Sequence, residues 1–309
     1  MSLLQVKDLQ VAFNGKPVVH GVSFDVAAGE KLAIVGESGS GKTVSALSLL
    51  RLVLNAQISG QAHFNGKDLL RMSEDELRVV RGDDIACIFQ EPMTALNPLY
   101  TVGNQIAEVY EEKKGLAVTE SAQAAIKMLA SVGITEPERR ANSYPHQLSG
   151  GQRQRATIAM ALASAPKLLI ADEPTTALDV TLRQQILQLL GSLQRERGMA
   201  VLLITHDLNL VRRFADRIAI MEQGRIVETG KVQEVFANPQ HPYTRKLLES
   251  KPVRDVVAPG DSKALLQADQ LTVTYPTHLG GFKGWFAKSV FVAVKSGYFQ
   301  VPAGHTLGV

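Results

Sequence analysis

Residues 36–43 form a glycine-rich segment whose residue types and spacing suit the binding of phosphate groups. The segment reads Gly36, Glu37, Ser38, Gly39, Ser40, Gly41, Lys42 and Thr43. Such glycines let backbone N–H groups curl around phosphates, and the positive N-terminal end of a following helix adds to the attraction. Lys42 would place a cation on the β- and γ-phosphates, and the Thr43 hydroxyl would ligate Mg²⁺. A glycine-rich turn without function is the alternative, but an expected strand over 31–35 and an expected helix over 44–54 supply the context that the motif requires.

Two carboxylates follow another apolar run. Asp172 and Glu173 come directly after residues 167–171 (KLLIA). An aspartate at the end of a buried strand suits Mg²⁺, directly or through water, and Glu173 could then act as general base toward an attacking water. Alone, such a pair could equally be a solvated strand end. Beside a phosphate-binding loop, the catalytic interpretation is favoured.

A second candidate anion cradle precedes the helix that we expect over 153–164. Its residues are Ser149, Gly150, Gly151 and Gln152. A serine with two glycines at the start of a helix can bind an anion through backbone N–H groups. Taken alone, an ordinary N-cap at Ser149 is the more common arrangement.

Two more polar residues lie at the ends of apolar runs. Gln90 ends the run 85–89, and His206 follows the run 200–204. Ligands in open α/β folds bind at the carboxyl ends of strands, so both are site candidates, although a lone residue there more often has a structural role. Cys87, in the middle of the first run, is expected to be a core residue.

The elements that must position these residues follow from the hydrophobic pattern. Short apolar runs alternate with helical stretches, which is typical of a parallel α/β sheet. The expected strands of this sheet are 31–35, 85–89, 167–171, 200–204 and 217–221. Residues 3–13 and 18–28 also resemble strands, and residues 58–70 resemble a hairpin around Asn65 and Gly66. Helices are expected over 101–165, with breaks at Gly115, Gly133 and Pro145, and over 180–197, with Gly198 as C-cap.

The composition is that of a globular protein. The chain has 309 residues, 45% of them hydrophobic, and a net charge of +3, and this length suggests about two domains. No run of five or more basic residues occurs, so binding to nucleic acid is not indicated. The single cysteine excludes an internal disulfide and a multi-cysteine metal site. Neither a signal peptide nor a run of about 18 apolar residues is present, so no leader and no membrane span are expected.

An internal repeat follows a polar, proline-bearing linker at 250–264. Residues 265–273 match residues 3–11 at five of nine positions, and residues 299–309 match residues 24–34 at five of eleven. Chance similarity between strand-rich segments is the alternative, but both blocks occur in the same order. We therefore expect one complete domain over 1–249 and the opening strands of a second, truncated domain over 265–309.

Together, these motifs resemble those of the ATP-binding cassette (ABC) family. The resemblance rests on the order of the motifs, which runs from an aromatic residue at Phe13 through the loop 36–43, Gln90, the Ser149 segment, the acidic pair, Asp179 in Ala-Leu-Asp, and His206. Phe13 stands where the family usually has tyrosine. Residues 89–98, 144–155, 172–187 and 241–248 (HPYTRKLL) look like the oligopeptide and dipeptide importer ATPases. A linker that leads into a second copy resembles the double-cassette importers of the microcin C and glutathione type, the former more closely.

The resemblance implies a P-loop NTPase (RecA-like) α/β fold. It would have a parallel core, an antiparallel β subdomain and a helical subdomain near 92–165. The implied cofactors are ATP and Mg²⁺, with Phe13 stacked on adenine. The residues implied for one face of the site are Lys42, Thr43, Gln90, Asp172, Glu173 and His206, with Gln90 also a metal ligand. The nucleotide contacts also include Ser149, Gly150, Gly151, Gln152 and Asp179, of which Ser149 and Gly151 would serve the opposite nucleotide.

The implied function is that of an ATP-hydrolysing subunit that energises the import of peptides or peptide-like solutes. Its partners would be a second cassette, the permease subunits and, indirectly, a solute-binding protein, at the cytoplasmic face of the bacterial inner membrane. One alternative is a nucleotide-binding half without turnover. Another is a tandem-cassette ATPase of translation or DNA repair, but the ribosome-acting members usually lack the His-Pro-Tyr-Thr tail and the repair members carry zinc-binding cysteines.

Overall fold

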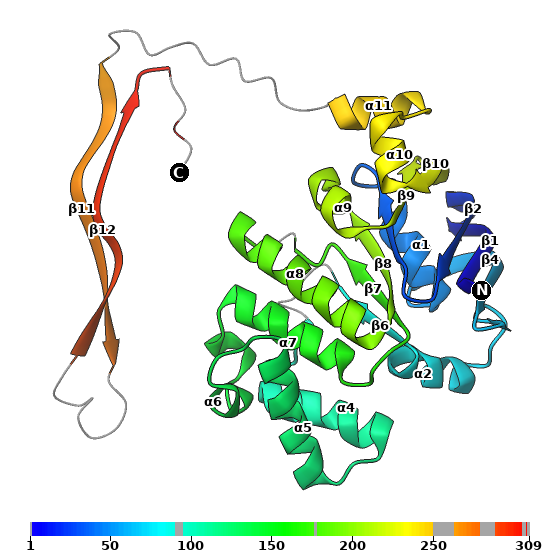
Figure 1. Cartoon of the computed structure of the whole chain (residues 1–309), viewed down its shortest axis with the longest axis horizontal. Coiled ribbons are helices and arrows are strands. Elements are labelled where there is room, and N and C mark those ends of the chain that lie inside the picture. The colour runs from blue at the N-terminus through cyan, green and yellow to red at the C-terminus, as the bar shows by residue number, and fades with distance from the viewer. Residues whose placement is uncertain are drawn as a thin grey trace. The chain divides into compact units, whose positions relative to one another are not determined.

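The computed structural model describes residues 2–89, 95–175, 178–249, 263–278, 288–304 and 307. The chain divides into two compact units, Met1–Ser250 and Lys251–Val309. Figure 1 shows the helices and strands of both units. None of the helices in these described ranges combines the length and apolar character that crossing a bilayer requires.

A six-stranded sheet forms the centre of the first unit. Its order is β10-β9-β3-β8-β7-β6, and only β10 runs antiparallel to its neighbour. The strands are β3 (Lys31–Val35), β6 (Ile85–Ile88), β7 (Leu168–Asp172), β8 (Ala200–Thr205), β9 (Arg217–Glu222) and β10 (Arg225–Lys231). The five apolar runs predicted as core strands are thus confirmed. The pattern did not reveal β10, because this edge strand is only partly buried and lacks an apolar run.

An antiparallel sheet of order β2-β1-β4-β5 covers one face of the first unit's core. Its strands are β1 (Ser2–Phe13), β2 (Lys16–Ala27), β4 (Ala56–Phe64) and β5 (Lys67–Asp68). The predicted hairpin is confirmed: Asn65 and Gly66 both have positive φ, 48° and 83°, as its two-residue turn requires. A bulge at Asp8 shifts the alternation of β1, so that Leu4 and Val6 before it and Leu9 and Val11 after it all face the core.

Helices cover the other face of the parallel sheet. Ala33 and Val35 of β3 face this helical side, whereas Leu32 and Ile34 face the antiparallel sheet and α1. Figure 1 shows α4, α5, α6 and α7 gathered in one helical layer. On both faces together, the helices in the described part of the first unit are α1 (Lys42–Leu49), α2 (Glu74–Asp83), α4 (Val102–Lys114), α5 (Val118–Ser131), α6 (Pro137–Ala141), the 3-10 helix η1 (Pro145–Gln147), α7 (Gly150–Leu162), α8 (Val180–Arg197), α9 (Leu208–Phe214), α10 (Val232–Ala237) and α11 (Pro242–Glu249).

Two predicted breaks agree with the structure, but two helices have other bounds than predicted, α7 and α1. The helix predicted over 153–164 is α7, which runs from Gly150 to Leu162. Gly115 and Gly198 are left-handed C-caps of α4 and α8, as expected. The helix predicted over 44–54 instead begins at Lys42 and ends at Leu49. The early end has a local cause: Arg51 adopts a φ of +50°, which a helix cannot continue through.

The second unit is a hairpin of β11 (Ala264–His278) and β12 (Lys288–Pro302). Its pairing repeats that of β1 and β2: Leu271 pairs with Gly297 as Leu9 pairs with Val22. Positive φ also recurs in the two hairpins at equivalent places, namely Asp8 and Gln270 in the first strands and Gly21 and Ser296 in the second strands. The two hairpins are therefore built on one pattern of pairing. Residues 250–262 of the expected linker lie outside the described residues.

Candidate functional site

The loop between β3 and α1 is closely packed at both ends. A Cβ atom added at Gly36 would lie 2.1 Å from the carbonyl oxygen of Met221 in β9. At Gly41, φ is +97° and a Cβ atom would lie 3.4 Å from the Val18 carbonyl oxygen of β2. Gly39 also has a positive φ, of +80°. The predicted glycines are therefore required by the conformation and the packing of this loop.

Replacing Gly36 with alanine is expected to destabilise the protein by about 1–3 kcal/mol, because the new methyl group would press on the β9 backbone. Gly150→Ala is the matched control, since its Cβ atom would meet nothing within 4 Å. Urea denaturation of both variants measures the free energy of unfolding. Equal stabilities for the two variants would contradict this account of the loop.

Lys42 is enclosed by this loop and is 5% exposed. Its Nζ atom donates hydrogen bonds of 2.8 Å to the carbonyl oxygens of Gly36 and Glu37. Burial lowers the pKa of Lys42, while the charges of Glu173 and Asp172 partly oppose that effect. The structure thus holds a desolvated ammonium group at the centre of a glycine-rich loop. An anionic ligand bound there would offset the free energy that desolvation of this group costs.

Asp172, at the end of β7, reaches the start of α1. The Thr43 hydroxyl donates a 3.0 Å hydrogen bond to Asp172 Oδ1. This bond joins α1, which follows β3, to the end of β7, although β8 lies between β3 and β7 in the sheet. Asp172 is 2% exposed, and burial raises its pKa; Glu173 adds to the rise, and Thr43 and Lys42 oppose it. No group of three or more His, Cys, Asp or Glu residues able to hold a metal occurs in the described part of the chain. A hydroxyl and one carboxylate fit Mg²⁺, which is usually held by few protein ligands together with phosphate and water.

Glu173 and His206 form the second pair of the site. Glu173 Oε1 lies 2.9 Å from His206 Nδ1, with side chains 14% and 54% exposed. The Glu173 N–H donates to the Ile204 carbonyl oxygen at 2.8 Å, and its φ is +44°, a conformation unusual for a non-glycine residue. The residues that sequence analysis assigned to catalysis and metal binding thus come together at the ends of β3, β7 and β8, apart from Gln90, which lies outside the described residues.

The segment before α7 forms a reciprocal cap. Ser149 Oγ accepts from the Gln152 N–H, and Gln152 Oε1 accepts from the Ser149 N–H. Gly151 is packed against Leu182, whereas Gly150 is open. The N-cap interpretation is therefore confirmed, and Figure 1 shows that α7 lies apart from α1 in this unit. This separation places Ser149 away from a nucleotide bound at Lys42 of the same chain.

Phe13 and Asp179 have structural contacts of their own. Phe13, at the end of β1, is partly buried against the core beneath the antiparallel sheet. Asp179 is the N-cap of α8, and its Oδ1 accepts from the Leu182 N–H at 2.9 Å. Their expected contacts with nucleotide remain predictions.

Two contacts of the site were not predicted from the sequence. Gln154, fully buried in α7, donates to the Pro174 carbonyl oxygen and thereby joins the helix to the loop after Glu173. Tyr243 accepts a hydrogen bond from the Glu37 N–H at 3.1 Å. The His-Pro-Tyr-Thr tail was the available signal for Tyr243, but it served only as a family marker.

Comparisons with known proteins agree with this geometry. The family described as "ABC transporter" matches residues 19–176, and the family described as "Oligopeptide/dipeptide transporter, C-terminal region" matches residues 227–272. The oligopeptide transport ATP-binding protein OppD of Bacillus subtilis is 50% identical over 257 residues, which are 81% of this chain and 72% of OppD. The chain belongs to the ABC transporter family. The family resemblance inferred from the motifs is confirmed, as is its oligopeptide/dipeptide type.

Longer relatives and solved structures extend this result. The ABC chain is 52% identical over 286 residues to the peptidoglycan transport ATP-binding protein YejF of Agrobacterium fabrum, and the match covers 90% of this chain. It spans 52% of the length of that relative and 59% of the YejF protein of Escherichia coli. The ATP-binding cassette MJ0796, solved as a dimer in a post-hydrolysis state with ADP and Pi, has a TM-score of 0.66 and 31% identity; the match covers 74% of this chain and 98% of that one. The predicted α/β cassette fold is thereby confirmed.

Proposed function

We propose that this ABC chain binds ATP with Mg²⁺ and hydrolyses it to energise the import of peptides or peptide-like solutes through a membrane permease. The observation that carries the proposal is the meeting of two pairs, Thr43 with Asp172 and Glu173 with His206, beside the buried Lys42. A peptide-type solute is supported by the match at residues 227–272 and by the names of several relatives, OppD among them.

The chemistry follows from the positions of these side chains. Lys42 and the loop amides would bind the β- and γ-phosphates. Thr43 and Asp172, together with Gln90 as predicted from the sequence, would hold Mg²⁺, which would supply positive charge to the phosphate oxygens. Glu173 accepts a proton from the water that attacks the γ-phosphorus, and the bond from this phosphorus to the β–γ bridging oxygen breaks, so that ADP leaves with the electron pair. His206 orients the Glu173 carboxylate through their 2.9 Å contact.

A complete site needs a second cassette. In our proposal, Ser149 and Gly151 of one cassette contact the nucleotide bound at Lys42 of the other, and Asp179 lies at the same interface. The MJ0796 cassette, solved as a dimer, supports such pairing. The pairing pattern that β11 and β12 share with β1 and β2 supports our assignment of residues 265–309 to the opening strands of a second cassette.

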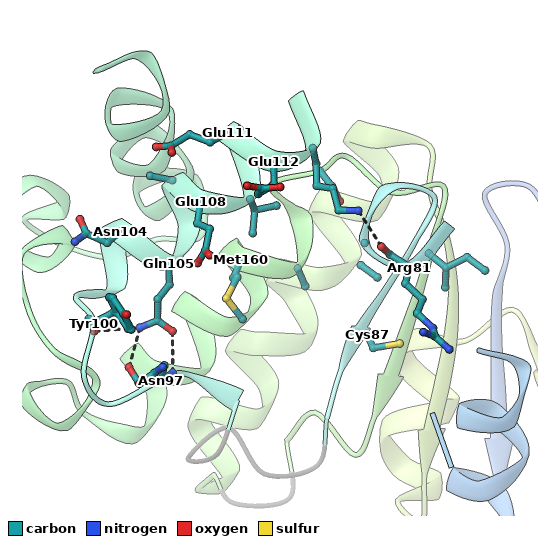
Figure 2. A pocket seen from close by; sticks show the side chains of 18 of the residues that line it. Arg81, Cys87, Asn97, Tyr100, Asn104, Gln105, Glu108, Glu111, Glu112 and Met160 are labelled. Atoms are coloured by element: carbon teal, nitrogen blue, oxygen red, sulfur yellow. Dashed lines mark hydrogen bonds between the residues drawn. The ribbon is translucent and has the colours of Figure 1, made fainter. Parts of the chain in front are cut away.

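A groove between α4 and the β6 side of the first unit is our candidate site for the permease. Its cavity is about 940 Å³ in volume. Figure 2 shows Glu108 and Glu112 of α4 on one wall and Arg81 and Cys87 on the other. Exposed apolar side chains also line it: Leu52, Phe89, Tyr100 and Val118. We propose that a short amphipathic cytoplasmic segment of the permease binds here and holds the chain peripherally at the inner membrane.

The proposal is tested by measuring Mg²⁺-dependent ATP hydrolysis as a function of protein concentration. If two chains must pair to complete a site, the rate per chain should rise with concentration, approaching linear dependence well below the dimer dissociation constant. A flat background rate with ATP still bound would instead favour a nucleotide-binding half without turnover. A chain that neither binds nor hydrolyses ATP would overturn the proposed function.

A further inference from the structure

The segment that leads into α11 is held tightly by one carboxylate of β10. Glu228 Oε1 accepts from the Gln240 N–H at 2.9 Å, and its Oε2 accepts from the His241 N–H at 3.0 Å. His241 Nδ1 in turn accepts from the Tyr243 N–H at 3.2 Å. The His-Pro-Tyr-Thr tail therefore starts its helix at a defined place on the first unit, and the His241 side chain holds the backbone of Tyr243 at that start.

Tyr243 points from this helix toward the glycine-rich loop. It is 7% exposed, and its ring belongs to the same buried cluster as Val232 and Val235 of α10. Its hydroxyl oxygen accepts the Glu37 N–H at 3.1 Å, across a separation of 206 residues. Burial raises the pKa of Tyr243, so the neutral phenol is retained at physiological pH.

The hydrogen bond of Tyr243 acts on the same peptide unit that holds Lys42. The Glu37 N–H and the Gly36 carbonyl belong to one planar trans peptide, in which the two groups point in opposite directions. At the carbonyl end of this peptide, Lys42 Nζ donates to the Gly36 oxygen at 2.8 Å. An ammonium group at one end polarises the peptide and strengthens the hydrogen bond at the other. The direction of the Gly36 carbonyl is therefore coupled to the Tyr243 hydroxyl.

We infer that Tyr243 is a positioning residue of the nucleotide loop, which orients the peptide between Gly36 and Glu37 and through it the ammonium group of Lys42. The inference rests on the proposed binding of ATP. The segment after β10, which contains the His-Pro-Tyr-Thr tail, thereby stabilises the phosphate-binding loop although it lies outside the P-loop motif. No ligand contact of Tyr243 itself is required.

The test is Tyr243→Phe, which keeps the buried ring and removes only the hydroxyl. Loss of one hydrogen bond predicts an increase in the dissociation constant for MgATP of about three- to tenfold, measured by calorimetry with the full chain. Tyr110→Phe is the matched control, because Tyr110 is a partly buried tyrosine of α4 outside the loop. This control should bind MgATP within about twofold of the unchanged protein.

Two further measurements separate positioning from packing. In a Lys42→Ala background, Tyr243→Phe should change the dissociation constant by less than about twofold, since the group that it positions is gone. In the ligand-free chain, amide hydrogen exchange of the peptide that spans residues 36–43 should be faster in Tyr243→Phe than in Tyr110→Phe, because the Glu37 N–H has lost its acceptor.

The outcomes are distinct. Unchanged exchange and unchanged MgATP affinity in Tyr243→Phe would overturn the inference. An affinity loss of equal size in both backgrounds would also overturn it, because the hydroxyl would then act independently of Lys42. If the unchanged protein does not bind MgATP, the proposed function fails, and faster exchange in Tyr243→Phe would then support only the bracing of the loop.

Discussion

Replacing Glu173 with glutamine is expected to lower ATP turnover by about 10²- to 10⁴-fold while ATP binding persists. Glutamine has nearly the same shape and can keep the contact to His206, but its amide cannot accept the proton of the attacking water. The hydrogen bonds from Lys42 Nζ to the Gly36 carbonyl oxygen and from the Thr43 hydroxyl to Asp172 are made by other residues, so ATP binding should persist. The measurement is phosphate release at a protein concentration where the unchanged chain is active, with calorimetry for ATP affinity.

The control for this prediction is Glu196→Gln, an exposed residue near the end of α8. It removes the same charge from the chain without touching the site, so its turnover should match that of the unchanged protein. Residual turnover of Glu173→Gln close to that of the control would contradict the assignment of Glu173 as general base. It would also mean that another group or bulk water accepts the proton.

Replacing Lys42 with alanine is expected to weaken MgATP binding by about 10- to 100-fold, since a hydrogen bond from a charged group contributes about 1.5–3 kcal/mol. The predicted loss is large because Lys42 is buried within the loop, where its attraction for phosphate is less screened by water. Titration with a fluorescent ATP analogue in the presence of Mg²⁺ measures the effect.

Lys127→Ala, an exposed lysine of α5, is the control for general charge effects. Its affinity for the nucleotide should equal that of the unchanged protein. A Lys42→Ala variant with an undiminished affinity would show that the loop amides alone bind the phosphates. Thermal unfolding of the ligand-free variant separates a loss of affinity from a loss of folding.

The core strands and the Asn65-Gly66 turn could be predicted from short stretches of the sequence. The apolar runs at β3, β7 and β8 are buried on both faces, so they lack polar interruptions and are easy to recognise. Asn65-Gly66 predicted its hairpin because few other residue pairs tolerate two consecutive positive φ angles. The edge strand β10 and the early end of α1 escaped prediction, since partial burial and a single left-handed residue leave weak signals in the sequence.

The candidate site was predictable as a set of residue types but not as a set of contacts. The spacing of the P-loop motif, with an expected strand before it and an expected helix after it, indicates phosphate binding, because the required backbone conformation depends on glycines within eight residues. The segment at Ser149 was ambiguous from sequence. The structure shows it as a reciprocal cap, and its proposed role at a nucleotide requires a second cassette.

The local sequence was therefore sufficient for the motifs, the fold class and the family of this chain. These properties depend on glycine conformations and on hydrophobic periods that span few residues. The hydrogen bonds from Thr43 to Asp172 and from Glu37 to Tyr243 join residues 129 and 206 positions apart. Such contacts depend on the order of strands in the sheet and on the packing of α11. Residues far apart in the chain determine both of these features together. Only the folded chain places Tyr243 at the loop, because nothing in the residues around it specifies which distant N–H its hydroxyl will meet.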